Sequence, residues 1–184
     1  FHSNDARGIT ARVDPAPGLV RTRGHEVGIR TEAIPQLQSS LALWQLDFDS
    51  ELVYVGDAGT TQAGRPSRRV GVEWSNHWRA TPHLTLEADL AWTRPRYADA
   101  STVGHFIANA VQQVAHLNLA LAAMGPWSGS IGLRYIGSAP LSEDNSLRSA
   151  PGTTLHGRIQ RQMSQQMTLS LDVLNLTNRS NNDI

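Results

Sequence analysis

The connectors between the apolar/polar alternating segments of this chain are short and long in turn. Three are long and polar, at residues 56–66, 95–109 and 137–152. Four are short, at residues 33–36, 79–82, 125–126 and 164–166. A soluble β-sandwich has no reason to sort its loops by length, whereas outer-membrane β-barrels join their strands by tight periplasmic turns and long external loops. The pattern therefore favours an antiparallel barrel that spans a membrane.

Eight strands fit between these connectors. We predict them at residues 20–32, 37–55, 67–78, 83–94, 110–124, 127–136, 153–163 and 167–175. Each is at least as long as the roughly 9–11 residues with which a tilted strand crosses a membrane. The longest uninterrupted apolar run, residues 119–124, is far shorter than the about 20 residues of a membrane helix. The expected fold class is all-β: an antiparallel up-and-down meander that forms part of a transmembrane β-barrel.

Each predicted strand has an apolar and a polar face, because successive side chains of a strand point to opposite faces. In the fourth strand, Leu86 and Leu90 share the apolar face and Thr85 lies opposite. Unpaired charges are costly to bury, so we expect the charged side chains of the polar face to line a wide, wet or plugged lumen. A soluble antiparallel sheet with one solvated face alternates identically, and this alternative stays open. The charged residues at strand centres are Glu26, Arg30, Glu73, Glu87, Asp89, Arg134, Arg158 and Asp172.

Aromatic residues mark both ends of the expected apolar band. Trp78 and Trp127 adjoin short connectors, and Trp92 and Tyr135 lie near long ones. Outer-membrane barrels carry an aromatic girdle at each interface of the membrane. Because any exposed strand end tolerates Trp, this agreement supports the barrel without deciding it.

The number of strands predicts that the barrel is larger than this chain. Eight strands return the chain to its starting side, which here is the side of the long connectors. Bacterial single-chain barrels have even strand counts, and we expect both of their ends on the side of the short turns. We therefore expect further strands before and after these 184 residues, which would be an internal piece of a longer protein.

Composition excludes several classes of function. The 16 basic and 16 acidic residues cancel, so there is no electrostatic footprint for nucleic acid. The chain contains no Cys, and no GxSxG, HExxH, P-loop or GxGxxG motif, so we predict no catalytic residue and no enzyme. Seven scattered His residues form no pair at ligand spacing, so we expect neither a metal site nor a cofactor. An acidic row at Asp47, Asp49 and Glu51 would suit Ca²⁺, but solvated charge is the favoured interpretation.

The candidates for ligand contact lie in the long connectors, because recognition usually resides in external loops on a rigid scaffold. These candidates are Asp57, Glu143, Asp144 and Asn145. The alternative interpretation is turn chemistry, since Asp and Asn side chains readily satisfy their own backbone.

A Gly-x-Glu pattern occurs twice on the polar face, as Gly24 with Glu26 and as Gly71 with Glu73. Glycine lets neighbouring groups approach closely. Each Glu could pair with an Arg of an adjacent strand or with a plug inside the barrel, and the pattern does not separate the two.

With these features in place, seven stretches resemble a known family. They are FHSNDARG at 1–8, RTRGHEVGIRT at 21–31, ALWQLDFDSELVYVGDAGTT at 42–61, PSRRVGVEW at 66–74, GPWSGSIGLRYIG at 125–137, EDNSLRS at 143–149 and LSLDVLNLTNRSNNDI at 169–184. In this order they resemble the C-terminal part of the β-barrel of TonB-dependent outer-membrane receptors.

The resemblance implies a barrel of 22 strands with an N-terminal plug domain, in the bacterial outer membrane. Residues 1–184 would be a partial barrel domain, strands 14 to 21, without the plug and the closing strand. The implied partners are outer-membrane lipid, the receptor's own plug, TonB acting through the N-terminal region, and a small-molecule ligand. No nucleic-acid partner is implied.

The function implied by the resemblance is TonB-energised uptake of a scarce ligand such as a siderophore or other metal complex. Cobalamin and sugars remain possible ligands. Two alternatives stay open: a non-transport outer-membrane barrel whose surface loops bind a partner, and a soluble antiparallel β domain.

Overall fold

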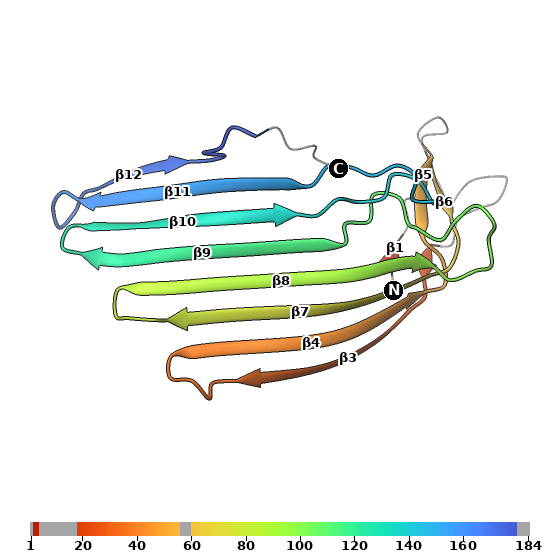
Figure 1. Cartoon of the computed structure of the whole chain (residues 1–184), viewed down its shortest axis with the longest axis horizontal. Coiled ribbons are helices and arrows are strands. Elements are labelled where there is room, and N and C mark those ends of the chain that lie inside the picture. The colour runs from red at the N-terminus through yellow and green to blue at the C-terminus, as the bar shows by residue number, and fades with distance from the viewer. Residues whose placement is uncertain (1, 4–17, 56–59, 180–184) are drawn as a thin grey trace.

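The computed structural model describes residues 2–3, 18–55 and 60–179 and shows one large antiparallel sheet with two small ones. The eight strands of the large sheet are ordered β12-β11-β10-β9-β8-β7-β4-β3, so each pairs with its neighbours along the chain (Figure 1). This confirms the predicted meander of eight strands. The bounds are β3 Thr22–Thr31, β4 Leu37–Phe48, β7 Ser67–Arg79, β8 Leu84–Tyr97, β9 Gln113–Met124, β10 Trp127–Ile136, β11 Gly152–Gln162 and β12 Thr168–Val173.

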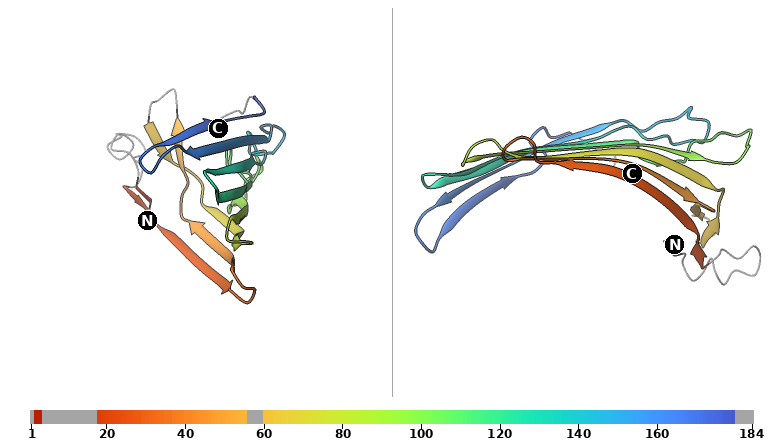
Figure 2. Two further views of the ribbon diagram at one scale, coloured as in Figure 1. Left: turned by 90° about the vertical axis from the view of Figure 1, so that its left-hand side faces the viewer. Right: turned by 90° about the horizontal axis from the view of Figure 1, so that it is seen from below.

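The large sheet is a single curved and twisted layer (Figure 2). Leu90, Leu169 and Leu171 are 43%, 64% and 61% exposed, so the apolar residues do not form an enclosed core between two sheets. Cross-strand partners keep this apolar face continuous, as in the row from Leu41 through Trp74 to Leu90. In the described part of the chain, no helix has the length and apolar character needed to cross a membrane.

The connectors are sorted by length as expected, with the short turns at one end of the sheet and the long loops at the other (Figure 1). The short turns use local chemistry. Gln36 and Gly125 adopt positive φ angles of 64°. The Thr81 hydroxyl accepts hydrogen bonds from the backbone N–H groups of His83 and Leu84, at 3.2 and 3.0 Å. Such turns reverse the chain within a few residues.

One predicted strand was wrong, and two others differ by a few residues at their ends. Residues 37–55 are not one strand, because β4 ends at Phe48 and β5 (Leu52–Val55) pairs with β6 (Thr60–Ala63). The break is held by Glu51, whose N–H donates to the Arg65 carbonyl at 2.8 Å and whose carbonyl accepts from Gly64 at 2.6 Å. The last strand is shorter than residues 167–175, because Asn175 takes a left-handed conformation with φ of 49°.

The start of the first predicted strand also differs. Residues 19 and 20 form β2 (Leu19–Val20), which pairs with β1 (His2–Ser3), and β3 begins only at Thr22. Among the described residues, the buried hydrophobic side chains are few and lie toward the long-loop end of the structure, away from the middle of the large sheet. They are Val20, Tyr97, Ile107 and Ala139.

Candidate functional site

The polar face of the sheet carries hydrogen-bonded groups that run across the strands. Glu87 of β8 accepts a hydrogen bond from Asn118 of β9 at 3.1 Å, and its other oxygen lies 3.2 Å from Nδ1 of His77 on β7. These residues are direct cross-strand partners. Glu87 therefore belongs to a polar row built by the strand register, and its place in a lumen stays a prediction.

A second row passes through Asp89. The Ser75 hydroxyl donates to one carboxylate oxygen of Asp89, and Nδ1 of His116 lies 3.6 Å from the other. The ring of His116 stacks on that of His156, with centroids 6.4 Å apart. Ser75, Asp89 and His116 lie on adjacent strands, and His156 lies two strands from His116, opposite Gly132 of β10, so this row also depends on the register.

Asp172 has an arginine partner, unlike Glu87 and Asp89, and forms an ion pair between the last two strands of the sheet. Nε of Arg158 on β11 donates to Oδ1 of Asp172 on β12, its register partner. Both side chains are exposed. Such a pair contributes little to stability.

The two Gly-x-Glu elements surround Trp44. The Trp44 ring lies over Gly71, where an added Cβ would be 2.5 Å from a ring carbon, and Leu46 lies over Gly24 at 2.8 Å. The expected close approach at both glycines is thus confirmed. Trp44 is the register partner of both Glu26 and Gly71, so it sits between the two elements.

The charges next to Trp44 lack a partner within the sheet. Glu26 and Glu73 make no ion pair or side-chain hydrogen bond with any residue that the structure describes. The same holds for Arg30 and Arg134 within residues 18–55 and 60–179. The buried Nε1 of Trp44 also has no hydrogen-bond partner there. The predicted cross-strand Arg is therefore not found, and contact with a plug stays a prediction.

Arg65 joins three segments at the long-loop end. Its guanidinium donates to both oxygens of Asp99, with Nη2–Oδ1 at 2.6 Å, and its Nη1 donates to Glu143 at 2.7 Å. Nη2 also reaches the Gly104 carbonyl at 3.0 Å, and the guanidinium lies 4.2 Å from the centroid of the Tyr97 ring. Hydrogen bonding by Arg65 holds the pKa of Asp99 below its usual value. Arg65 thus connects the start of β7 with the loop between β8 and β9 and with the loop between β10 and β11.

These two loops, the β8–β9 loop (residues 98–112) and the β10–β11 loop (residues 137–151), also touch through their backbones. The Phe106 N–H donates to the Glu143 carbonyl at 3.0 Å, and the Asn109 N–H donates to the Pro140 carbonyl at 2.8 Å. Gly104, with φ of 146°, packs so closely that an added Cβ would lie 2.1 Å from the Glu143 carbonyl oxygen. The loops therefore form one ordered cap beside the end of the sheet.

The predicted ligand-contact residues lie in this cap and have partners of their own. The Asp144 carboxylate accepts hydrogen bonds from the Ser142 hydroxyl at 2.5 Å and the Ser146 N–H at 3.1 Å, which lowers its pKa to about 2. Asn145 has φ of 62° and accepts from Arg148. Their contacts are those of turn chemistry, and a role in ligand contact stays a prediction. Asp57 lies outside the described residues.

Two members of the acidic row, Asp47 and Glu51, form ion pairs with arginines of β7. Arg68 pairs with Asp47 at 2.6 Å, and Arg69 donates to both oxygens of Glu51 at 2.8 and 2.9 Å. No group of three or more His, Asp or Glu residues suited to a metal ion occurs in the described ranges. The sequence reasoning had missed Arg65 and Arg69. The available signal was the acidic row at Asp47, Asp49 and Glu51 earlier in the chain, but nothing in the sequence paired these arginines with particular acids.

Solved structures with a similar fold include uptake receptors and a metal transporter. The ferric-catecholate import receptor Fiu from E. coli K12 superposes with a TM-score of 0.72 and 18% identity, over 97% of this chain and 26% of that one. The ferric yersiniabactin uptake receptor FyuA from Yersinia pestis gives 0.73 and 18%, over 86% and 25%. The copper transporter OprC gives 0.68 and 17%, over 86% and 25%. The chain thus spans about a quarter of these receptors.

No curated protein matches the chain at the level of sequence. The family described as "TonB dependent receptor-like, beta-barrel" matches residues 4–176, which is nearly the whole chain. This match agrees with the exposed apolar face, the charged opposite face and the segregated loops. The chain therefore belongs to the TonB-dependent receptors, a family of non-enzymatic transporters of the bacterial outer membrane.

Proposed function

We propose that these residues form part of the wall of a TonB-energised importer that takes up a siderophore or another metal complex. The observation that carries the proposal is the division of one sheet into a bare apolar face and a charged face, in a chain of this family. The apolar face meets outer-membrane lipid and the charged face lines the passage. A soluble β domain would have to cover the apolar face.

Metal complexes are the ligand class that the structural neighbours support. Two of them are named for ferric catecholates and ferric yersiniabactin, and a third is named a copper transporter. The identity is at most 18% in these three, so the likeness itself shows only the fold. A siderophore or similar chelate is the ligand that we infer for this chain.

The cap formed by the two long loops is the proposed first contact of the ligand. Arg65, Asp99 and Glu143 hold it in one arrangement. A preorganised binding surface loses less conformational entropy when ligand binds. Asp144, Asn145 and Asp57 remain candidates for direct contact.

The partners inside the barrel are a plug domain and, through it, TonB. Glu26 and Glu73, which have no described partner, stand on either side of Trp44 on the charged face. A cationic side chain of the plug would be attracted both by these carboxylates and by the face of the indole. We infer that this is where the wall holds the plug.

The test is uptake by the whole receptor in cells with and without TonB. Radioactive iron as a catecholate complex, ferric citrate and radioactive copper serve as probes. We expect one of them to bind in both cell types and to accumulate only where TonB is present. Accumulation without TonB would reject energised transport. Binding without accumulation in either cell type would instead indicate a barrel whose loops bind a partner.

A further inference from the structure

A β-bulge changes the direction of side chains near the short turn between β9 and β10. Trp127 pairs with Met124, and Gly129 pairs with Leu121. Between these two pairs β9 has one residue more than β10, so the bulge lies in β9. One extra residue in a strand shifts its alternation by one position. Met124 therefore lies on the same apolar face as Leu121 and Trp127.

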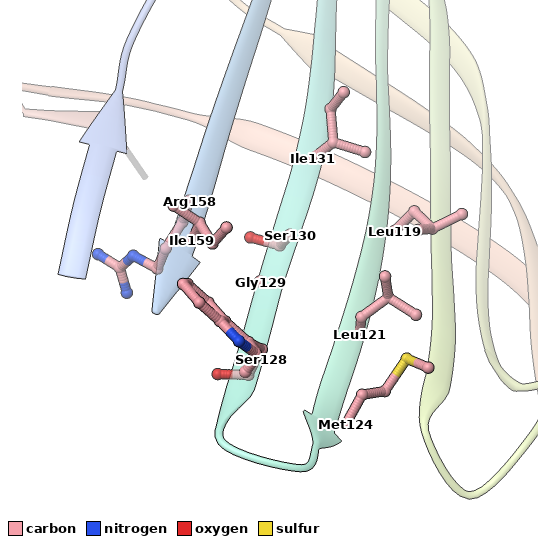
Figure 3. Close-up of a pocket in the computed structure, with 10 residues that line it drawn as sticks. Leu119, Leu121, Met124, Ser128, Gly129, Ser130, Ile131, Arg158 and Ile159 are labelled. Carbon is pink, nitrogen blue, oxygen red and sulfur yellow. The ribbon is translucent and has the colours of Figure 1, made fainter. Parts of the chain in front are cut away.

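An apolar hollow of about 350 Å³ lies beside this bulge. Leu119, Leu121 and Ile131 line it together with Met124 and Ile159 (Figure 3). Its floor is Gly129, which has Leu121 and Ile159 as register partners and where an added Cβ would be 2.6 Å from the Arg158 carbonyl oxygen. The absence of a side chain at this position keeps the hollow open.

A cation stands at the short-turn end of the hollow. Arg161 is the register partner of Trp127, and its guanidinium lies 5.1 Å from the centroid of the Trp127 ring. Arg161 has no ion pair or side-chain hydrogen bond among the residues that the structure describes. Between residues 113 and 167 the carboxylates are Glu143 and Asp144, both in the β10–β11 loop at the opposite end of the strands. Asp172 on the neighbouring strand β12 pairs with Arg158 instead. The charge of Arg161 is thus not neutralised by the protein nearby.

The position of these groups matches the depth of a lipid headgroup. Trp127 directly follows the short turn, and short turns of outer-membrane barrels lie on the periplasmic side. Trp is enriched where apolar chains meet headgroups. Toward the membrane centre the hollow is apolar. Level with Trp127, its register partner Arg161 offers two or more N–H donors in the geometry that suits a phosphate.

We propose that this hollow binds one phospholipid of the inner leaflet, with an acyl chain against Leu121, Ile131 and Ile159 and the phosphate on Arg161. Burial of the acyl chain against apolar side chains supplies affinity, and the guanidinium of Arg161 selects a lipid with an anionic headgroup. The site is independent of the ligand that the receptor imports.

The test is lipid binding to the whole receptor, stripped of lipid in detergent and titrated with palmitoyl-oleoyl phosphatidylglycerol under native mass spectrometry. We expect Arg161→Gln to weaken binding of the first lipid by about tenfold, the scale of one hydrogen bond to a charged group. Arg79→Gln is the matched control, because Arg79 is exposed at the same end but on the polar face. It should leave the affinity unchanged.

A second pair of variants tests the hollow itself. Leu121→Trp fills it, whereas Leu41→Trp enlarges a side chain of similar exposure elsewhere on the apolar face, 41% against 40%. We expect only the first to reduce binding. If Leu121→Trp fails to give a heat-modifiable barrel, Met124→Trp at the rim replaces it. Unchanged affinity in Arg161→Gln, or equal losses in both members of either pair, would overturn the proposal. So would equally tight binding of inorganic phosphate, which has no acyl chain.

Discussion

Arg65 and Glu143 are 78 positions apart in the sequence, and their side chains form an ion pair of 2.7 Å. The same guanidinium binds Asp99, 34 positions away. A single side chain therefore bridges the β8–β9 and β10–β11 loops, in addition to the backbone hydrogen bonds between them. The guanidinium can serve both carboxylates because its N–H donors point in several fixed directions.

Replacing Arg65 should loosen the cap without unfolding the barrel. In Arg65→Ala, we expect faster hydrogen exchange in residues 98–112 and 137–151, and unchanged exchange in β8 and β9. Arg94→Ala is the control, since Arg94 lies near the same end of β8 and has no described ion pair. Equal exchange in the loops of both variants would show that backbone contacts alone hold the cap.

The tip of the β10–β11 loop should lose its order only in strong acid. The pKa of Asp144 is lowered from 3.8 to about 2 by hydrogen bonds from Ser142 and Ser146. A carboxyl whose pKa is lower when folded stabilises the folded form above the unfolded value and loses this effect as the pH falls through the folded value. A spin label at Leu147 should thus be immobile down to about pH 4 and become mobile toward pH 2. In Asp144→Asn its mobility should not change over this range.

Charge on the apolar face should be more damaging than charge on the polar face. Leu86→Arg places a cation against lipid, at a cost of about 2–4 kcal/mol near the membrane centre. Thr85→Arg, one residue away, adds a cation to a face that already holds charges. In the intact receptor, the fraction of heat-modifiable barrel on gels should fall for Leu86→Arg and stay near wild type for Thr85→Arg. Equal losses would mean that the faces are assigned wrongly.

Neutralising the carboxylates beside Trp44 should weaken the hold on the plug. In the whole receptor, Glu26→Gln combined with Glu73→Gln removes both charges and keeps the side-chain shapes. We expect cells with this variant to become sensitive to an antibiotic too large to cross an intact outer membrane. Glu32→Gln, at an exposed position beside the first short turn, is the control and should leave the cells resistant.

Shortening the cap should reduce ligand binding while the barrel persists. Deletion of residues 138–149 removes the partner of Arg65 and the buried Ala139. We expect weaker binding of the radioactive metal complex that the receptor takes up, with heat-modifiability retained. Unchanged binding would exclude the β10–β11 loop from the ligand site and leave the family assignment intact.

Much of this fold follows from the sequence alone, because its signals are local. Alternation with a period of two residues decides which side chains share a face, and it placed Leu86 opposite Thr85 and Glu87 beside Asp89. Turn residues and connector lengths decide the order of the strands. The family could also be recognised, since short stretches such as LDVLNL keep their pattern along the chain.

Other features were decided by tertiary structure, because they depend on residues that are distant in the sequence. The break between β4 and β5 follows from backbone contacts of Glu51 with Arg65 and Gly64. The bulge that turns Met124 toward Trp127 appears only when β9 and β10 pair. The partners of Arg65 come from two later loops. A local pattern predicts which face of the sheet a side chain occupies. Which side chains contact one another on that face is determined only by the register of the paired strands.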